Sequence, residues 1–77
     1  MNGSKEIVTI SVPKGDLEND YTFFEDGKIR HNYDQNENKR DLEAWITPRS
    51  IADGDKDKII KACPLQFKAK ITALLKK

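Results

Sequence analysis

The feature that most constrains this chain is residues 21–33, in which an Asp26-Gly27 pair separates two runs rich in aromatic and β-branched residues. Asp-Gly favours the positive φ angles of a two-residue type I′ turn, so the segment predicts a β-hairpin. A two-residue turn sets Phe23 opposite Arg30. Because neighbouring residues of a strand point to opposite sides, both faces of this hairpin would carry aromatic rings.

On this predicted register, Tyr21, Phe23 and Arg30 share one face, and Phe24 and Ile29 share the other. Two rings beside a guanidinium form a platform that can stack bases or hold a peptide. Helices that follow a sheet cover only one of its faces, so one aromatic set must be covered by Trp45 and the 34–41 loop, be covered by a second protein, or stay exposed. We therefore assign Tyr21, Phe23 and Arg30 as candidate protein-binding residues.

The segments on either side of the hairpin differ in character. Residues 5–12 alternate and are rich in β-branched residues, which predicts a first strand. Consecutive strands usually pair as a meander, so this strand would lie at an edge that is open to augmentation or to dimer formation. Residues 34–41 contain no apolar residue and predict a mobile loop, and residues 1–4 are expected to be disordered.

The C-terminal part of the chain predicts helices. Thr47-Pro48 is a typical helix start, with Thr47 as the N-cap, and predicts a short helix of about two turns. Residues 56–62 predict a second helix that ends before Pro64. From Pro64 to Leu74, apolar residues recur at spacings of three and four, which predicts a final helix with lysines opposite its apolar stripe.

Together these elements predict a single α+β domain over residues 1–77. An N-terminal meander of three antiparallel strands, with its hairpin turn at Asp26-Gly27, would be packed on one face by two or three C-terminal helices. Trp45 and Phe67 are expected to lie between the two layers. A chain of this length hides little more than half of its surface, so the core must be thin, and a second copy or a parent protein would add stability.

Charge is sorted along the chain, because residues 56–77 carry seven lysines and one acid, whereas residues 1–55 carry seven basic and twelve acidic residues. A basic face can bind phosphates, with an affinity that falls as salt rises. These lysines are spread out and no arginine accompanies them, so a solvated helix face is the simpler explanation. Nucleic-acid binding is therefore the alternative function, and its candidate residues are Lys56, Lys58, Lys61, Lys68 and Lys70.

The acidic residues at the start of the second predicted helix do not complete a metal site. Asp53, Asp55 and Asp57 match only the opening of a calcium-binding loop, since Lys58 and Pro64 stand where that loop needs glycine and glutamate. Acidic side chains are common at a helix N-terminus, where they interact favourably with the helix dipole. We therefore expect no metal and no cofactor.

The single histidine and the single cysteine are expected to serve packing. His31 lies within a predicted strand, where a half-buried packing residue is the usual role. Cys63 lies at the junction of two predicted helices, which favours burial as a small apolar group. No Ser-His-Asp set and no glycine-rich phosphate loop can be assembled, so we expect no catalytic residue and do not expect an enzyme.

One unpaired cysteine, with neither a secretory signal nor an apolar run long enough to span a membrane, predicts a cytoplasmic protein without a membrane partner. We expect a small non-catalytic protein-interaction module or accessory domain, whose partner is another protein or a second copy of itself. Nucleic-acid binding through the lysines and the aromatic platform is the alternative. No motif assigns the chain to a known family.

Overall fold

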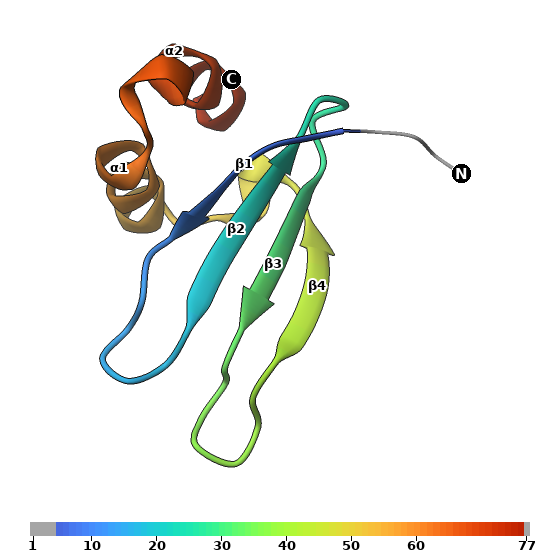
Figure 1. The fold of residues 1–77 in the computed structure, drawn as a ribbon, viewed down its shortest axis with the longest axis vertical. Helices are drawn as coiled ribbons and strands as arrows, with labels where there is room; N and C mark the ends of the chain where they lie inside the picture. The colour runs from blue at the N-terminus through green and yellow to red at the C-terminus, as the bar shows by residue number, and fades with distance from the viewer. Residues whose placement is uncertain (1–4, 77) are drawn as a thin grey trace.

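Four antiparallel strands form one sheet in the computed structural model, which describes residues 5–76 (Figure 1). The predicted disorder of residues 1–4 lies outside the described residues. The strands follow one another as a meander, and the helices come after them in the chain, which confirms the α+β class. In chain order the elements are β1 (Glu6–Ser11), β2 (Asn19–Phe24), β3 (Ile29–Tyr33), β4 (Leu42–Ile46), the 3-10 turn η1 (Pro48–Ser50), α1 (Asp53–Ala62) and α2 (Leu65–Leu75).

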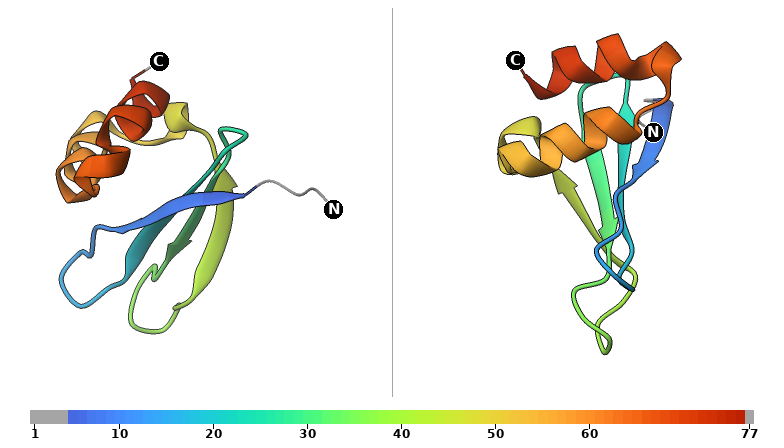
Figure 2. Two further views of the ribbon diagram at one scale, coloured as in Figure 1. Left: turned by 45° about the horizontal axis from the view of Figure 1, so that its top comes forward. Right: turned by 90° about the vertical axis from the view of Figure 1, so that its left-hand side faces the viewer.

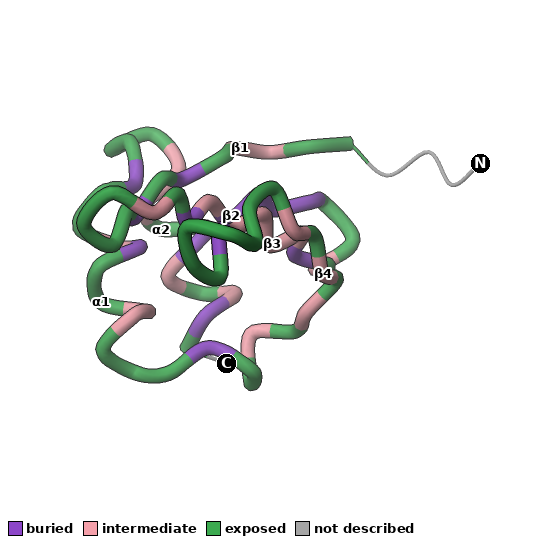
Figure 3. Tube along the Cα trace, turned by 90° about the horizontal axis from the view of Figure 1, so that it is seen from below, coloured by how far each residue is buried: buried purple, intermediate pink, exposed green. Residues whose placement is uncertain are grey.

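The prediction of three strands is wrong, because residues 42–46 form a fourth strand beside β3. Its side chains alternate between half-buried and exposed, which is the two-residue period of a strand with one open side (Figure 3). Trp45 is one of the exposed residues, with 56% of its surface accessible. The expectation that Trp45 lies between the layers is therefore also wrong, whereas Phe67 packs against the margin of the core.

The turn at Asp26-Gly27 joins β2 to β3 as predicted, but its loop has three residues instead of two. The Gly27 amide donates to the Phe24 carbonyl at 3.0 Å, and the Phe24 amide donates to the Lys28 carbonyl at 3.0 Å. Gly27 has a φ of 90°, which closes a type I turn followed by a left-handed residue, the usual three-residue hairpin loop. The extra residue shifts the predicted register by one, so Phe23 pairs with Ile29.

Both helices lie on the same face of the sheet (Figure 2). The core forms between them and that face. Phe23 and Ile59 are fully buried at 0% accessible surface, and Ile29 is 1% accessible. Among the described residues, the buried cluster consists of Ile10, Val12, Tyr21, Phe23, Ile29, Ile51, Ile59, Cys63, Ile71 and Leu75. No helix of residues 5–76 covers the second face of the sheet, as the predicted architecture required.

The helical segments start and stop where local chemistry dictates. Thr47-Pro48 opens only the single turn η1, because Ile51 already has an extended backbone and turns inward to become 6% accessible. α1 begins earlier than predicted, with two acidic residues in its first turn that suit the helix dipole. α2 begins directly after Pro64, as its sequence period predicted.

No helix in the described part of the chain combines the length and the apolar character needed to cross a membrane.

Candidate functional site

The structure separates the three residues that the sequence grouped as a protein-binding face. Tyr21 and Phe23 are 4% and 0% accessible, and both belong to the core beneath the helices. Arg30 pairs with Thr22, one position along the strand, and so lies on the opposite face of the sheet. The shared face expected of Tyr21, Phe23 and Arg30 is thus not formed, because the hairpin loop is one residue longer than a two-residue turn.

A different aromatic and cationic group occupies the face that the helices leave open. We define the open-face cluster as Phe24, Arg30 and Trp45. The Phe24 and Trp45 ring centroids are 5.3 Å apart at an angle of 45°, and the Arg30 guanidinium carbon lies 5.5 Å from the centre of the Phe24 ring. Arg30 and Trp45 are also direct cross-strand partners. They cover Phe24, which is only 8% accessible, while Trp45 itself stays largely exposed.

A β-bulge in β1 supplies the carboxylate that holds Arg30 in place. The register of β1 against β2 shifts between Glu6 and Val8, so Glu6 stands beside Phe24 instead of joining Val8 on the covered face. From there its Oε1 accepts a hydrogen bond from Arg30 Nη2 at 3.2 Å. Both side chains are partly exposed, so this ion pair contributes little free energy and serves mainly to orient the guanidinium.

Arg30 is the only basic residue that the strand register places on the open face within β1 to β4. Its Nε is buried and has no hydrogen-bond partner among residues 5–76. Hydroxyl groups line the middle of the same face, where Thr9 and Thr22 are joined by a 2.9 Å hydrogen bond. Asp20 and Glu43 stand further along it, and Asp20 accepts a hydrogen bond from a serine of β1 at 2.7 Å. The open face is therefore polar and slightly acidic around one aromatic and cationic cluster.

The candidate nucleic-acid lysines lie on the other side of the molecule. They belong to α1 and α2, which pack on the covered face (Figure 2). Lys56 Nζ is 3.9 Å from a carboxylate oxygen of Asp53, so part of its charge is already compensated. The sheet therefore separates all five residues, Lys56, Lys58, Lys61, Lys68 and Lys70, from the open-face cluster.

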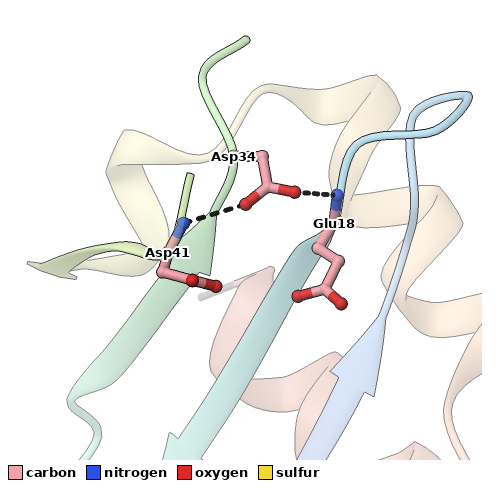
Figure 4. Close-up of side chains that lie close together, drawn as sticks. All are labelled: Glu18, Asp34 and Asp41. Carbon is pink, nitrogen blue, oxygen red and sulfur yellow. Dashed lines mark hydrogen bonds between the residues drawn. The ribbon is translucent and has the colours of Figure 1, made fainter. Parts of the chain in front are cut away.

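Three carboxylates meet where two loops approach each other (Figure 4). Asp34 accepts the Glu18 amide at 3.0 Å through one oxygen and the Asp41 amide at 2.9 Å through the other. These bonds, first from Asp41 and then from Glu18, hold the pKa of Asp34 below its ordinary value. Asp41 adopts a φ of 58° within this cluster, and both Asp34 oxygens take part in closing the 34–41 loop.

A partly buried polar stack lies on the covered face. The His31 ring lies between Tyr21 and Tyr33, with both ring centroids 4.5 Å away. The Asn19 side-chain amide nitrogen donates to the Val12 carbonyl at 3.2 Å, which leaves its oxygen to accept a hydrogen bond from His31 Nε2 at 2.5 Å. His31 Nε2 therefore carries a hydrogen, and the ring is half-buried within β3, as its place in the sequence predicted.

The electrostatics of His31 and Cys63 agree with packing roles. Burial lowers the pKa of His31, and the nearby Lys14 lowers it further. Cys63 is 5% accessible and unpaired, and burial raises the pKa of its thiol above the ordinary value. Both groups are thus held in their uncharged forms near neutral pH.

Comparison of the chain with protein-family models, with curated proteins and with solved structures found no match in any of the three. Function is therefore inferred from the surface geometry.

Proposed function

We propose that this protein is a small non-catalytic interaction module that binds another protein chain through its open-face cluster. The observation that carries the proposal is the exposure of Trp45 beside Arg30 on a sheet face without a covering layer. Tryptophan and arginine are the side chains most enriched among the residues that dominate protein–protein binding energies.

The energy available at Trp45 is large enough to matter. A tryptophan side chain buries about 150–250 Å², and at about 25 cal/mol per Å² the half that remains exposed would contribute roughly 2–3 kcal/mol on burial. That gain corresponds to a factor of about 30 to 150 in affinity. Arg30 adds a fixed guanidinium, because Glu6 already restrains it and less side-chain entropy is lost on binding.

The charge of the open face favours a protein partner over a nucleic acid. A phosphate backbone requires several cations along one surface, whereas the open face has Arg30 together with the carboxylates of Asp20 and Glu43. The lysines that could bind phosphates lie on α1 and α2, which pack on the covered face. The open-face cluster and the lysines of α1 and α2 therefore do not form one continuous surface, so nucleic-acid binding is the weaker alternative.

We also propose a cytoplasmic location and a role without catalysis. The buried and unpaired thiol of Cys63 suits a reducing compartment. His31 is engaged in a ring stack and an amide hydrogen bond, which is a structural use of the only histidine.

Affinity capture with matched variants tests the proposal. The full chain, Trp45→Ala and Leu65→Ala would be immobilised and exposed to an extract of the source cells. Leu65 is the matched control because it is 86% exposed but lies at the start of α2, away from the open face. We expect specific proteins that the full chain and Leu65→Ala retain and Trp45→Ala loses. Identical binding profiles for all three chains would overturn the proposal.

Titration with single- and double-stranded oligonucleotides at about 50 mM salt tests the alternative. We expect no binding that depends on Trp45. Saturable binding that Trp45→Ala and Lys61→Ala both weaken would favour nucleic acid instead.

A further inference from the structure

The two edges of the sheet are protected to different degrees. β1 carries a bulge between Glu6 and Val8 and packs beside α1, two features that discourage another strand from pairing there. β4 has five residues, a regular register against β3 and a single charge, Glu43. It contains no lysine, proline or bulge, which are the usual means of blocking an edge strand. Figure 1 shows both helices on the β1 side, so within residues 5–76 no element pairs with the outer side of β4, which we call the bare edge.

The backbone groups that β4 presents outward can be assigned from the ladder. The Asp34 amide donates to the Glu18 carbonyl at 2.9 Å, and hydrogen-bonded pairs alternate along antiparallel strands. Thr22 and Arg30 are therefore a bonded pair, so the intervening residues of β3 direct their amides and carbonyls toward β4. It follows that Glu43 and Trp45 direct theirs away from the sheet.

We propose that the bare edge of β4 pairs antiparallel with β4 of a second copy, with Ala44 opposite Ala44 at the two-fold axis. This inference rests on the proposed function, since it names the partner chain as another copy. Only outward-directed residues can form bonded pairs across the seam, which leaves three registers. Glu43 can lie opposite Trp45 of the second copy, Glu43 can lie opposite Glu43, or Trp45 can lie opposite Trp45. Glu43 opposite Glu43 sets like charges together, and Trp45 opposite Trp45 shortens the paired overlap. Glu43 opposite Trp45 avoids both costs and uses all five residues of each strand.

Side chains of different character meet across the seam in this register. On the open face, one row across the seam places Glu43 beside Trp45 of the second copy. Strands are about 4.8 Å apart, so the Glu43 carboxylate can lie against the positive edge of the indole, while the Arg30 guanidinium stays turned toward Glu6 and Phe24. The two Trp45 rings become diagonal neighbours, which lie within reach of each other. On the other face, half-buried Leu42 meets Ile46 of the second copy.

The expected dimer is weak and reversible. Five paired residues and two indoles bury less than the roughly 1,200–2,000 Å² of a standard stable interface. A dissociation constant of about 10–100 µM is in keeping with a contact of that size. The symmetry of the pairing closes the assembly at two copies, because each chain has one bare edge and the bulged β1 remains outside the contact.

Sedimentation velocity of the full chain from about 5 µM to 1 mM tests the dimer, with proline variants at the two edges as a matched pair. Glu43→Pro removes an outward amide and leaves the bonds between β3 and β4 intact. Ser11→Pro makes the same change at the β1 edge. We expect a monomer–dimer equilibrium in the full chain and in Ser11→Pro, and a monomer throughout the range in Glu43→Pro. A full chain that stays monomeric at 1 mM, or a folded Glu43→Pro that dimerises like the full chain, would overturn the proposal.

A charge variant keeps the test decisive if Glu43→Pro fails to fold by circular dichroism. Trp45→Glu keeps the backbone but sets a carboxylate opposite Glu43 of the second copy, so we expect dimerisation at least tenfold weaker than in the full chain. Unchanged dimerisation in Trp45→Glu would contradict the proposed pairing. The two proposals can fail separately. If the full chain is monomeric, and Glu43→Pro still captures partner proteins that Trp45→Ala does not, the dimer is wrong but the proposed function stands.

Discussion

The two faces of the sheet bury adjacent phenylalanines by different means. Phe23 points under the helices and is fully buried, whereas Phe24 points the other way and is 8% accessible beneath Arg30 and Trp45. The covered face is closed by apolar side chains from two helices. The open face is closed by one guanidinium and one indole that itself remains exposed. The chain therefore buries its apolar side chains fully on the covered face but leaves the Trp45 indole exposed on the open face. Burial of that indole by a partner would contribute favourable free energy to binding.

Truncation of Phe23 should have the largest effect. Phe23→Ala leaves a cavity in the closed core and is expected to lower the free energy of unfolding by about 3–5 kcal/mol, measured by urea denaturation. In a chain this small such a loss approaches the total stability, so the variant should be largely unfolded without a stabilising osmolyte. A fully folded Phe23→Ala would contradict the assignment of this ring to the core.

Phe24→Ala should cost less than Phe23→Ala. The residues above Phe24 are long or exposed and can collapse into the space, which reduces the cavity penalty. We expect a loss of about 2 kcal/mol in the same denaturation experiment, with a folded chain at 25 °C. If the two variants lose the same free energy of unfolding, the two faces do not differ in how tightly they bury their phenylalanines.

The covered face should also govern the response to acid. Burial and Lys14 lower the pKa of folded His31, so the unfolded chain binds the proton more tightly. The stability due to uncharged His31 is present above pH 6.5 and decreases as the pH falls below that value toward the lowered pKa. The negative charges of Asp55 and Asp20 oppose this lowering of the His31 pKa.

Denaturation midpoints at pH 7.5 and pH 5.5 measure this dependence, with His31→Gln as the control. We expect the full chain to lose more stability than His31→Gln between these two values. A full chain that gains stability on acidification relative to the variant would reverse the sign and contradict the buried stack.

Trp45→Ala should have the smallest effect on stability and a large effect on association. The ring contacts Phe24 on one side only, so we expect a loss of about 0.5–1 kcal/mol by denaturation. Dimer formation and partner capture should both be abolished or strongly reduced. A loss of several kcal/mol would instead place Trp45 in the core.

The sequence was sufficient to predict the hairpin, the final helix and helices that cover only one face of the sheet, and it pointed to an aromatic and cationic platform on the hairpin. It did not predict the members of that platform. Asp26-Gly27 serves two-residue and three-residue turns alike, and a change of one residue moves every following side chain to the other face. Arg30 was therefore grouped with Phe23 and Tyr21, although it lies with Phe24.

Residues 42–46 show a second limit of sequence patterns. Trp45 was expected in the core because it is a large apolar side chain, although tryptophan is rarely fully buried. The alternation of Leu42, Ala44 and Ile46 is the signal that reveals β4. The Asp34 cluster was missed for a different reason. It bonds the backbone of Glu18, which is distant in sequence, and no local pattern encodes such a contact.

Acrylamide quenching of tryptophan fluorescence tests the central claim most directly, because Trp45 is the only tryptophan in the chain. At about 1 µM folded protein, below the expected dimer range, we predict quenching close to half as efficient as in the urea-unfolded chain. If the folded chain at that concentration is quenched as weakly as a buried tryptophan, the claim that Trp45 is exposed on the open face is wrong.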